Sequence, residues 1–198
     1  MPKRVAVIAS GETERQALPA LTRELVAEGT VVTSVLKPPR QQALRLELVR
    51  KLIVSEWFAN RSKPPDKFVI LIDTDHKPSE AVRRPLLPLA SQVPEVTVPI
   101  LVACAVPHLE SWFFADEQGL RQFLGRDLGA VDASSPDSIR NPKLHLSHLL
   151  GRPYTAQAAG RIAAALAPSA IHARSPSFRS FEAALRNGHQ RVEQRLLQ

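Results

Sequence analysis

The sequence predicts an α/β fold, with a four-stranded, mainly parallel sheet flanked by helices and a helical C-terminal region. Short apolar runs alternate with amphipathic helical segments over the first 125 residues, a pattern typical of parallel strands joined by right-handed crossovers. Phe68 to Ile72 are five apolar residues without a polar interruption, as expected of a strand buried on both faces. Gly11 and Thr13 follow the first apolar run and favour a tight turn into a helix.

The order of the elements follows from apolar periodicity and from glycine and proline positions. We predict strands at residues 4–9, 31–36, 68–72 and 99–106. We predict helices at residues 12–28, 40–59, 78–92, 141–150, 155–166 and 176–197, with another helix opening within 107–116. Pro85 and Pro88 interrupt the third of these helices. We therefore divide the chain into an α/β domain, residues 1–125, and a basic helical region, residues 126–198, which begins with a loop at 126–140.

The composition is that of a globular protein, with 44% hydrophobic and 23% charged residues. No apolar run approaches the ~20 residues of a membrane span, and the first residues lack the apolar core of a signal peptide. We therefore expect a cytoplasmic protein without a membrane partner. Cys104, the single cysteine, reads as a small buried hydrophobe.

The positive charge is concentrated near the C-terminus. Residues 1–139 carry 17 basic and 17 acidic side chains, whereas residues 140–198 carry 9 and 2, within a net charge of +7. This asymmetry indicates an anionic partner, and nucleic acid is the first candidate because its phosphates attract Lys and Arg regardless of sequence. A solvated basic face is the alternative.

Two acids, Asp73 and Asp75, follow the third predicted strand. Ligands of open α/β sheets bind at the carboxyl ends of the strands, and side chains two apart on an extended segment point the same way. A hard cation, Mg²⁺ or Mn²⁺, would relieve the repulsion between the two carboxylates. In the alternative reading, one Asp caps the helix near Pro78 and the other is solvated.

The same edge of the sheet should collect further acids. Because all strand ends of a parallel sheet face one way, Glu12, Glu14 and Glu110 are expected there together with the two aspartates and Ser10. The α/β domain is therefore expected to have an acidic mouth.

Several motifs resemble the Toprim domain of topoisomerases, primases and overcoming-lysogenization-type nucleases, a Rossmann-like fold. More of the chain resembles a family of small bacterial Toprim-like proteins, some of which are effectors paired with an ATPase in anti-phage defence of the PARIS type. The matching pieces, in the order of that family, are Gly11-Glu12-Thr13-Glu14, Asp73-Thr74-Asp75, Pro107-His108-Leu109-Glu110-Ser111-Trp112, Asn141-Pro142-Lys143 with Leu149-Leu150, Tyr154, and Ser175-Pro176-Ser177-Phe178-Arg179.

This resemblance implies a nuclease that uses Mg²⁺ or Mn²⁺ on DNA or RNA. It implies three groups of site residues: metal ligands Glu14, Asp73 and Asp75; catalytic acids Glu12, Glu14 and Glu110; and phosphate contacts from Lys143, Arg152, Arg174 and Arg179. An ATPase of the AAA or ABC type and a second copy of the chain are the implied protein partners.

Ser10 departs from the pattern, which has Glu before the glycine of the first motif. Either Glu12 or Glu14 supplies the missing carboxylate, or the fold has kept its metal-binding acids and lost its chemistry. The alternative function is therefore a catalytically inactive docking or nucleic-acid-sensing subunit of an ATPase complex. An aspartyl phosphatase is disfavoured, because its Asp-x-Asp motif closes the first strand.

Overall fold

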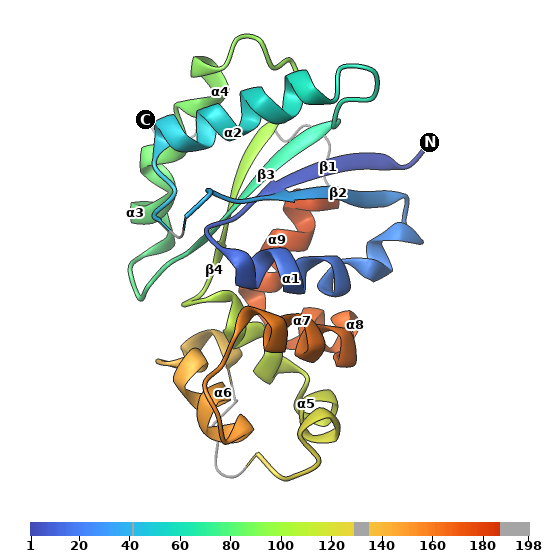
Figure 1. Ribbon diagram of the computed structural model, residues 1–198, viewed down its shortest axis with the longest axis vertical. Helices are drawn as coiled ribbons and strands as arrows, with labels where there is room; N and C mark the ends of the chain where they lie inside the picture. Colours follow the sequence, from blue (N-terminus) through green and yellow to red (C-terminus); the bar gives the residue numbers. More distant parts are fainter. Residues whose placement is uncertain (41, 129–134, 187–198) are drawn as a thin grey trace, which may run out of the picture.

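The computed structural model describes residues 1–40, 42–128 and 135–186. Its centre is a four-stranded sheet composed of β1 (Lys3–Ile8), β2 (Thr30–Leu36), β3 (Lys67–Asp73) and β4 (Ile100–Ala105). The strand order is β2-β1-β3-β4, and every neighbouring pair is parallel (Figure 1). The predicted α/β fold is therefore confirmed, and the sheet is parallel throughout.

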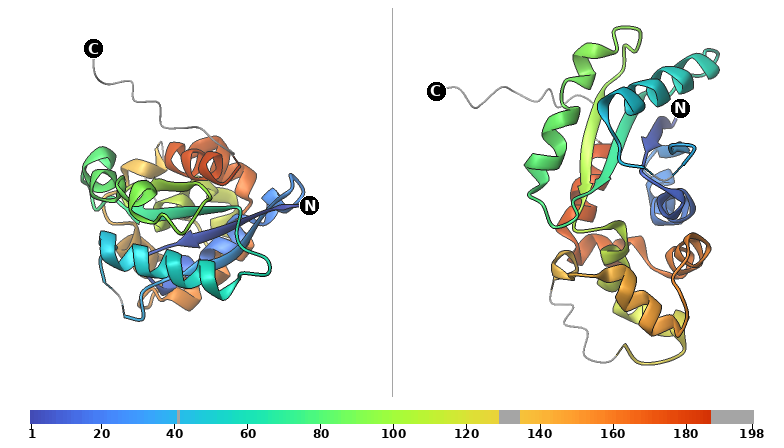
Figure 2. Two further views of the ribbon diagram at one scale, coloured as in Figure 1. Left: turned by 90° about the horizontal axis from the view of Figure 1, so that it is seen from above. Right: turned by 60° about the vertical axis from the view of Figure 1, so that its left-hand side comes forward.

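Helices cover both faces of the sheet. Successive side chains of a strand point to opposite faces, and here both sets are apolar and need to be buried. On one face, Ala6, Ile8, Phe68 and Ile70 pack against α2 (Leu46–Ala59), η2 (Arg84–Leu86) and α4 (Leu89–Gln92). On the other face, Val5, Val7, Val69 and Leu71 pack against α1 (Glu12–Leu21) and the C-terminal helices. Figure 2 shows the sheet between α2 and α9 (Pro176–Arg186).

The remaining elements follow β4 or connect the strands. They are η1 (Arg23–Val26), α3 (Ser79–Arg83), η3 (Leu109–Ala115), α5 (Glu117–Leu124), η4 (Pro136–Ser138), α6 (Pro142–Leu150), α7 (Ala156–Ala165) and α8 (Pro168–Arg174). Helices α5 to α8 form the lower half of the molecule in Figure 1, on the side where β4 leaves the sheet. The predicted domains, 1–125 and 126–198, share one hydrophobic cluster that contains both Val7 and Phe178.

Several predicted helices have different bounds. The first ends at Leu21, where the Thr22 hydroxyl donates to the Leu18 carbonyl, and η1 follows. The second begins at Leu46 rather than residue 40. The third is divided into α3, η2 and α4, in line with the two prolines, which lack the N–H that a helix needs.

The C-terminal half also differs in detail from the sequence-based expectation. The segment after β4 that was expected to open a helix forms a 3-10 helix, η3. Between the helices predicted at 155–166 and 176–197, the structure has a further helix, α8, which begins at Pro168 because proline is well suited to the first turn of a helix. The helix predicted at 176–197 is seen as α9, ending at Arg186, and its remainder lies outside the described residues, as does the 129–134 part of the predicted loop.

Helices α1 and α7 pack in close contact. A Cβ atom at Gly160 of α7 would lie 3.1 Å from the main-chain oxygen of Gln16 in α1, tighter than ordinary van der Waals contact. Arg23 adds a link, because its guanidinium donates to the carbonyls of Ala20 (2.8 Å) and Leu166 (2.5 Å). The helix that follows β1 is therefore held by the C-terminal region.

Helix α9 is anchored to the sheet and to η3. The ammonium of Lys67, a residue 1% exposed, donates to the carbonyls of Ala184 (2.7 Å) and Leu185 (3.1 Å), and Lys3 donates to the carbonyl of Arg186 (2.5 Å). Cations interact favourably with main-chain carbonyls toward the C-terminal end of a helix. Burial, with a smaller contribution from Lys3, lowers the pKa of Lys67 to about 8.

Trp112 connects η3 to α9. Its indole N–H donates to the Ser177 hydroxyl (2.8 Å), and its ring stacks on Phe181 and meets Phe178 edge-on. All three rings are fully buried.

None of the helices in the part of the chain that the structure describes has the length and apolarity needed to cross a bilayer.

We expect Trp112→Ala to lower the free energy of unfolding by about 3–5 kcal/mol, because it removes a fully buried ring and leaves a cavity. Urea denaturation followed by circular dichroism measures this change. Phe58→Ala is the matched control, since Phe58 is 40% exposed and its loss should cost less than about 1 kcal/mol. Equal effects of the two substitutions would contradict the anchoring role of Trp112.

Candidate functional site

Three buried or half-buried carboxylates converge beyond the carboxyl ends of β1, β3 and β4. Asp73 is the last residue of β3, Glu14 lies in the first turn of α1, and Glu110 lies at the start of η3, just after β4. The charge of Glu14 raises the pKa of both Asp73 and Glu110, which places the three side chains in one electrostatic neighbourhood. We refer to Glu14, Asp73 and Glu110 as the acidic cluster.

Glu110 is the most deeply buried member, with 1% of its surface exposed. Neither of its carboxylate oxygens has a partner with hydrogen-bond geometry among the described residues. The Tyr154 hydroxyl lies close enough to influence the pKa of Glu110, yet it also lacks such a partner there. Burial raises the pKa of Glu110 to about 7, and burial together with the charge of Glu110 raises the pKa of Tyr154. Glu110 is therefore a deeply buried carboxylate that Lys143 and the Tyr154 hydroxyl adjoin.

Asp73 accepts a hydrogen bond from the main-chain N–H of Leu109 (3.1 Å). Its side chain is 13% exposed. Burial, followed by the charges of Glu14 and Glu110, raises the pKa of Asp73 well above its ordinary value, and the Leu109 N–H offsets part of this effect. An ionised Asp73 thus needs a nearby cation.

The two glutamates of the first motif occupy different surroundings. Glu14 is 6% exposed and accepts a hydrogen bond from the Ser10 hydroxyl (2.9 Å). Glu12 instead faces outward, where it accepts from Arg15 (2.7 Å) and Gln16 (2.7 Å) and pairs with Lys37. The hydrogen bonds from Arg15 and Gln16 lower the pKa of Glu12. The structure therefore brings Glu14, and not Glu12, to Asp73 and Glu110, and Ser10 supports Glu14.

Lys143 is the cation beside this cluster. Its ammonium lies 3.8 Å from a carboxylate oxygen of Asp73 and 3.8 Å from Oε1 of Glu110. It comes from the first turn of α6, which Pro142 begins. The surrounding carboxylates, with Glu110 first, outweigh burial and raise the pKa of Lys143. This pairing was not part of the sequence-based interpretation, which assigned Lys143 to a phosphate.

Asp75 is more exposed than the acidic cluster, and its charge contributes to the raised pKa of Lys143. Its side chain is 68% exposed and pairs with Nε2 of His108 (2.8 Å). Asp75 and His76 both adopt positive φ angles, 48° and 65°, so the chain turns sharply after β3 and the two aspartates do not share one extended segment. Burial and the nearby Lys143 lower the pKa of His108. His108 belongs to the motif Pro107–Trp112 that the sequence analysis identified, but the sequence predicted no role for it.

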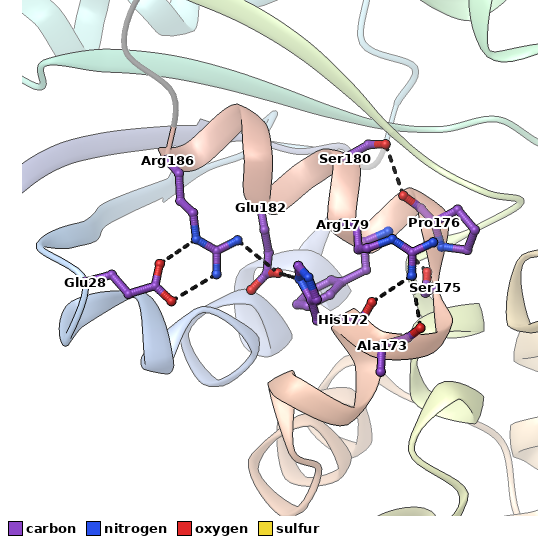
Figure 3. Close-up of polar contacts among 10 residues, drawn as sticks. Glu28, His172, Ala173, Ser175, Pro176, Arg179, Ser180, Glu182 and Arg186 are labelled. Atoms are coloured by element: carbon purple, nitrogen blue, oxygen red, sulfur yellow. Dashed lines mark hydrogen bonds and ion pairs between the residues drawn. The ribbon is translucent and has the colours of Figure 1, made fainter.

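Two of the predicted phosphate-binding arginines, Arg174 and Arg179, form hydrogen bonds to residues of α5 and α8. Arg174 donates to the Glu117 carboxylate (2.8 Å). Arg179 donates to the carbonyls of His172 (2.9 Å) and Ala173 (3.0 Å), as Figure 3 shows. Arg152 has an exposed position after α6. These arginines belong to the helical region, and Lys143 is the only one of the four predicted phosphate contacts that the structure pairs with the acidic cluster in the described residues.

Arg186 contributes to a second polar network in the same region. It pairs with Glu28 (2.5 Å) and with Glu182 (3.3 Å), and Glu182 in turn contacts His172 (Figure 3). This chain of charges ties α8 and α9 to the turn before β2. Much of the basic excess near the C-terminus therefore serves internal contacts.

The acidic cluster is not a complete metal centre by itself. In residues 1–40, 42–128 and 135–186, no three His, Cys, Asp or Glu side chains lie close enough to form a metal-binding group. A cation here would draw its remaining ligands from water or substrate.

The comparison with protein families gave one match. Residues 10–186 match the family model described as a domain of unknown function (DUF4276). The match covers most of the chain and includes the acidic cluster, so the chain belongs to this family. Searches of curated proteins and of solved structures gave no match.

The raised pKa of Glu110 predicts a pH-dependent stability in metal-free buffer. The unfolded side chain loses its proton near pH 4.5 and the folded one near pH 7. The contribution of Glu110 to the free energy of unfolding is therefore fully present below pH 4.5 and is lost as the pH rises through about 7. Glu110→Gln should therefore become more stable than the natural protein by up to about 3 kcal/mol at pH 8, with little difference at pH 4.5.

Urea denaturation with EDTA at a series of pH values measures this difference. Glu95→Gln is the control, because Glu95 is exposed and its effect should not change with pH. A Glu110→Gln variant that is less stable at pH 8 would mean that the charged carboxylate is favoured in the fold.

Proposed function

We propose that this member of the DUF4276 family is a divalent-cation-dependent phosphodiester nuclease of the Toprim type, acting on DNA or RNA. The observation that carries the proposal is the pair of shielded carboxylates, Asp73 and Glu110, that meet at Lys143 at the carboxyl edge of a parallel sheet, where α/β proteins bind ligands. The motif resemblance to Toprim-like proteins supports the same reaction class and suggests a role in anti-phage defence.

Mg²⁺ or Mn²⁺ is the cofactor that fits these residues. Glu110 has two buried oxygens without partners in hydrogen-bond geometry among the described residues. Burial and the neighbouring carboxylates raise the pKa of Asp73, so a nearby cation would stabilise its ionised form. Mg²⁺ commonly uses one or two protein carboxylates and completes its shell with waters and substrate phosphate. When bound, such a cation polarises a phosphoryl oxygen and lowers the pKa of a coordinated water.

The residues of the chain have separate roles in this proposal. Asp73 and Glu110 would hold the cation, water and substrate would supply its other ligands, and Glu14, which accepts a hydrogen bond from Ser10, would accept a proton. Lys143 would bind a substrate phosphate. Asp75 is exposed and paired with His108, so it would reach the cation only by exchanging that partner.

A second candidate function is a non-catalytic docking or nucleic-acid-sensing module of an AAA- or ABC-type ATPase. Two observations favour it. Lys143 already offsets the charge of Asp73 and Glu110, and Ser10 replaces the glutamate of the resembled motif. In this role, the acidic cluster would be a structural ion-pair network.

Metal binding separates these candidates. We expect Mn²⁺ to bind the natural protein in calorimetry at pH 8, and Asp73→Asn to weaken binding at least about tenfold, because the variant loses a charged ligand. Glu95→Gln, a change of charge on an exposed residue, should bind normally. Unchanged binding by Asp73→Asn would place the cation elsewhere.

Cleavage of plasmid DNA and of tRNA tests the chemistry itself. We expect Mg²⁺- or Mn²⁺-dependent cleavage that falls by about 10²–10⁴ in Glu14→Gln, because one positioned acid–base group typically contributes that much. If Glu14 has not replaced the missing glutamate, cleavage should instead be slow and rise in Ser10→Glu. Glu12→Gln serves as a matched control, since Glu12 pairs with Arg15 and Lys37 outside the cluster.

An absence of cleavage by both the natural protein and Ser10→Glu, with the metal bound, would favour the docking module. Cleavage that survives both Asp73→Asn and Glu14→Gln would mean that another site or a contaminant is responsible.

A further inference from the structure

Lys143 has an unusual position for a residue expected to contact substrate. Its ammonium is equidistant, at 3.8 Å, from carboxylate oxygens of Asp73 and Glu110, the two residues proposed to hold the metal. Both carboxylates are largely shielded from water, with exposed fractions of 13% and 1% for their side chains. The ammonium therefore stands where a divalent cation would be attracted by the same two groups.

We propose that Lys143 acts as a resident cation of the acidic cluster, which a divalent metal ion must displace in order to bind. This inference rests on the proposed metal-dependent function and adds that one side chain of α6 sets the affinity for the metal. The displaced ammonium then becomes available to an anionic ligand, such as a phosphate of the substrate.

Electrostatics and exposure both support displacement. A +1 and a +2 charge a few ångströms apart repel strongly where water is scarce, so the lysine and the metal disfavour each other at this place. About half of the Lys143 side chain, 48%, is exposed, so it can turn outward without opening the hydrophobic core. Lys143 is the first residue after Pro142 in α6, and the backbone of the helix need not change for the side chain to leave.

The first test compares Mn²⁺ affinities by calorimetry at pH 8.5. Lys143→Met keeps much of the length of the side chain and removes its charge, and we expect it to bind at least about tenfold more tightly than the natural protein. Lys143→Arg keeps the charge and should not bind more tightly. Lys77→Met is the control for an exposed lysine after β3 and should leave the affinity unchanged.

The outcomes distinguish the two proposals. If the natural protein binds Mn²⁺ and Lys143→Met binds equally or more weakly, the lysine is not a competitor and the inference is overturned, while the metal site stands. If neither protein binds Mn²⁺, the proposed metal-dependent function itself is overturned, and the inference falls with it.

A second measurement uses the natural protein and does not depend on the folding of a variant. Lysines are modified with an amine-reactive reagent and quantified by mass spectrometry, with and without Mn²⁺. We expect modification of Lys143 to become several-fold faster with Mn²⁺, while that of Lys77 does not change. An unchanged or slower rate at Lys143, with the metal demonstrably bound, would overturn the inference.

Discussion

The structure depends on a conflict between burial and charge at one edge of the sheet. Asp73 and Glu110 are shielded from water, which raises the pKa of both carboxyl groups, and the charge of the neighbouring Glu14 raises them further. Protonation, a lysine or a divalent cation can relieve this conflict. The first dominates at low pH, the second is present in the fold, and the third requires a ligand. If the site binds a divalent cation, as we propose, its state is set by competition among these three.

The C-terminal helices are part of this arrangement. Helix α6 brings Lys143 to the carboxylates, α7 packs on the helix that carries Glu14, and α9 holds η3, which carries Glu110, through Trp112. All three helices follow the last strand of the sheet in the chain. Each acid nevertheless has a helix more than 30 residues away along the chain acting on it, either by pairing with it or by packing on the element that carries it.

The sequence was sufficient to predict the sheet and the collection of acids at its carboxyl edge, because unbroken apolar runs and the topology of parallel strands determine both. It was not sufficient to separate Asp73 from Asp75. That difference arises from positive φ angles at Asp75 and His76, which neither residue type requires. The pairing of Lys143 and the outward position of Glu12 likewise depend on tertiary neighbours that local sequence does not encode.

Charge counting in the sequence was similarly incomplete. The basic excess of residues 140–198 predicts a phosphate-binding surface, but a guanidinium can equally satisfy the carbonyls at the end of a helix. Arg179 does so, and Arg186 is bound to Glu28 and Glu182. Net charge reports how many cations a segment has, and only the packing shows how many face outward.

The close contact at Gly160 has a consequence for how this protein can be dissected. Because a methyl group at that glycine would lie only 3.1 Å from the main-chain oxygen of Gln16, α7 and α1 are in closer contact than a larger residue would allow without a shift. A fragment that contained only the sheet and its first helices would expose the side that α7 covers on α1, the helix that carries Glu14. Engineering of this chain, by truncation or by fusion to another protein, therefore has to keep residues 156–165 together with the first twenty.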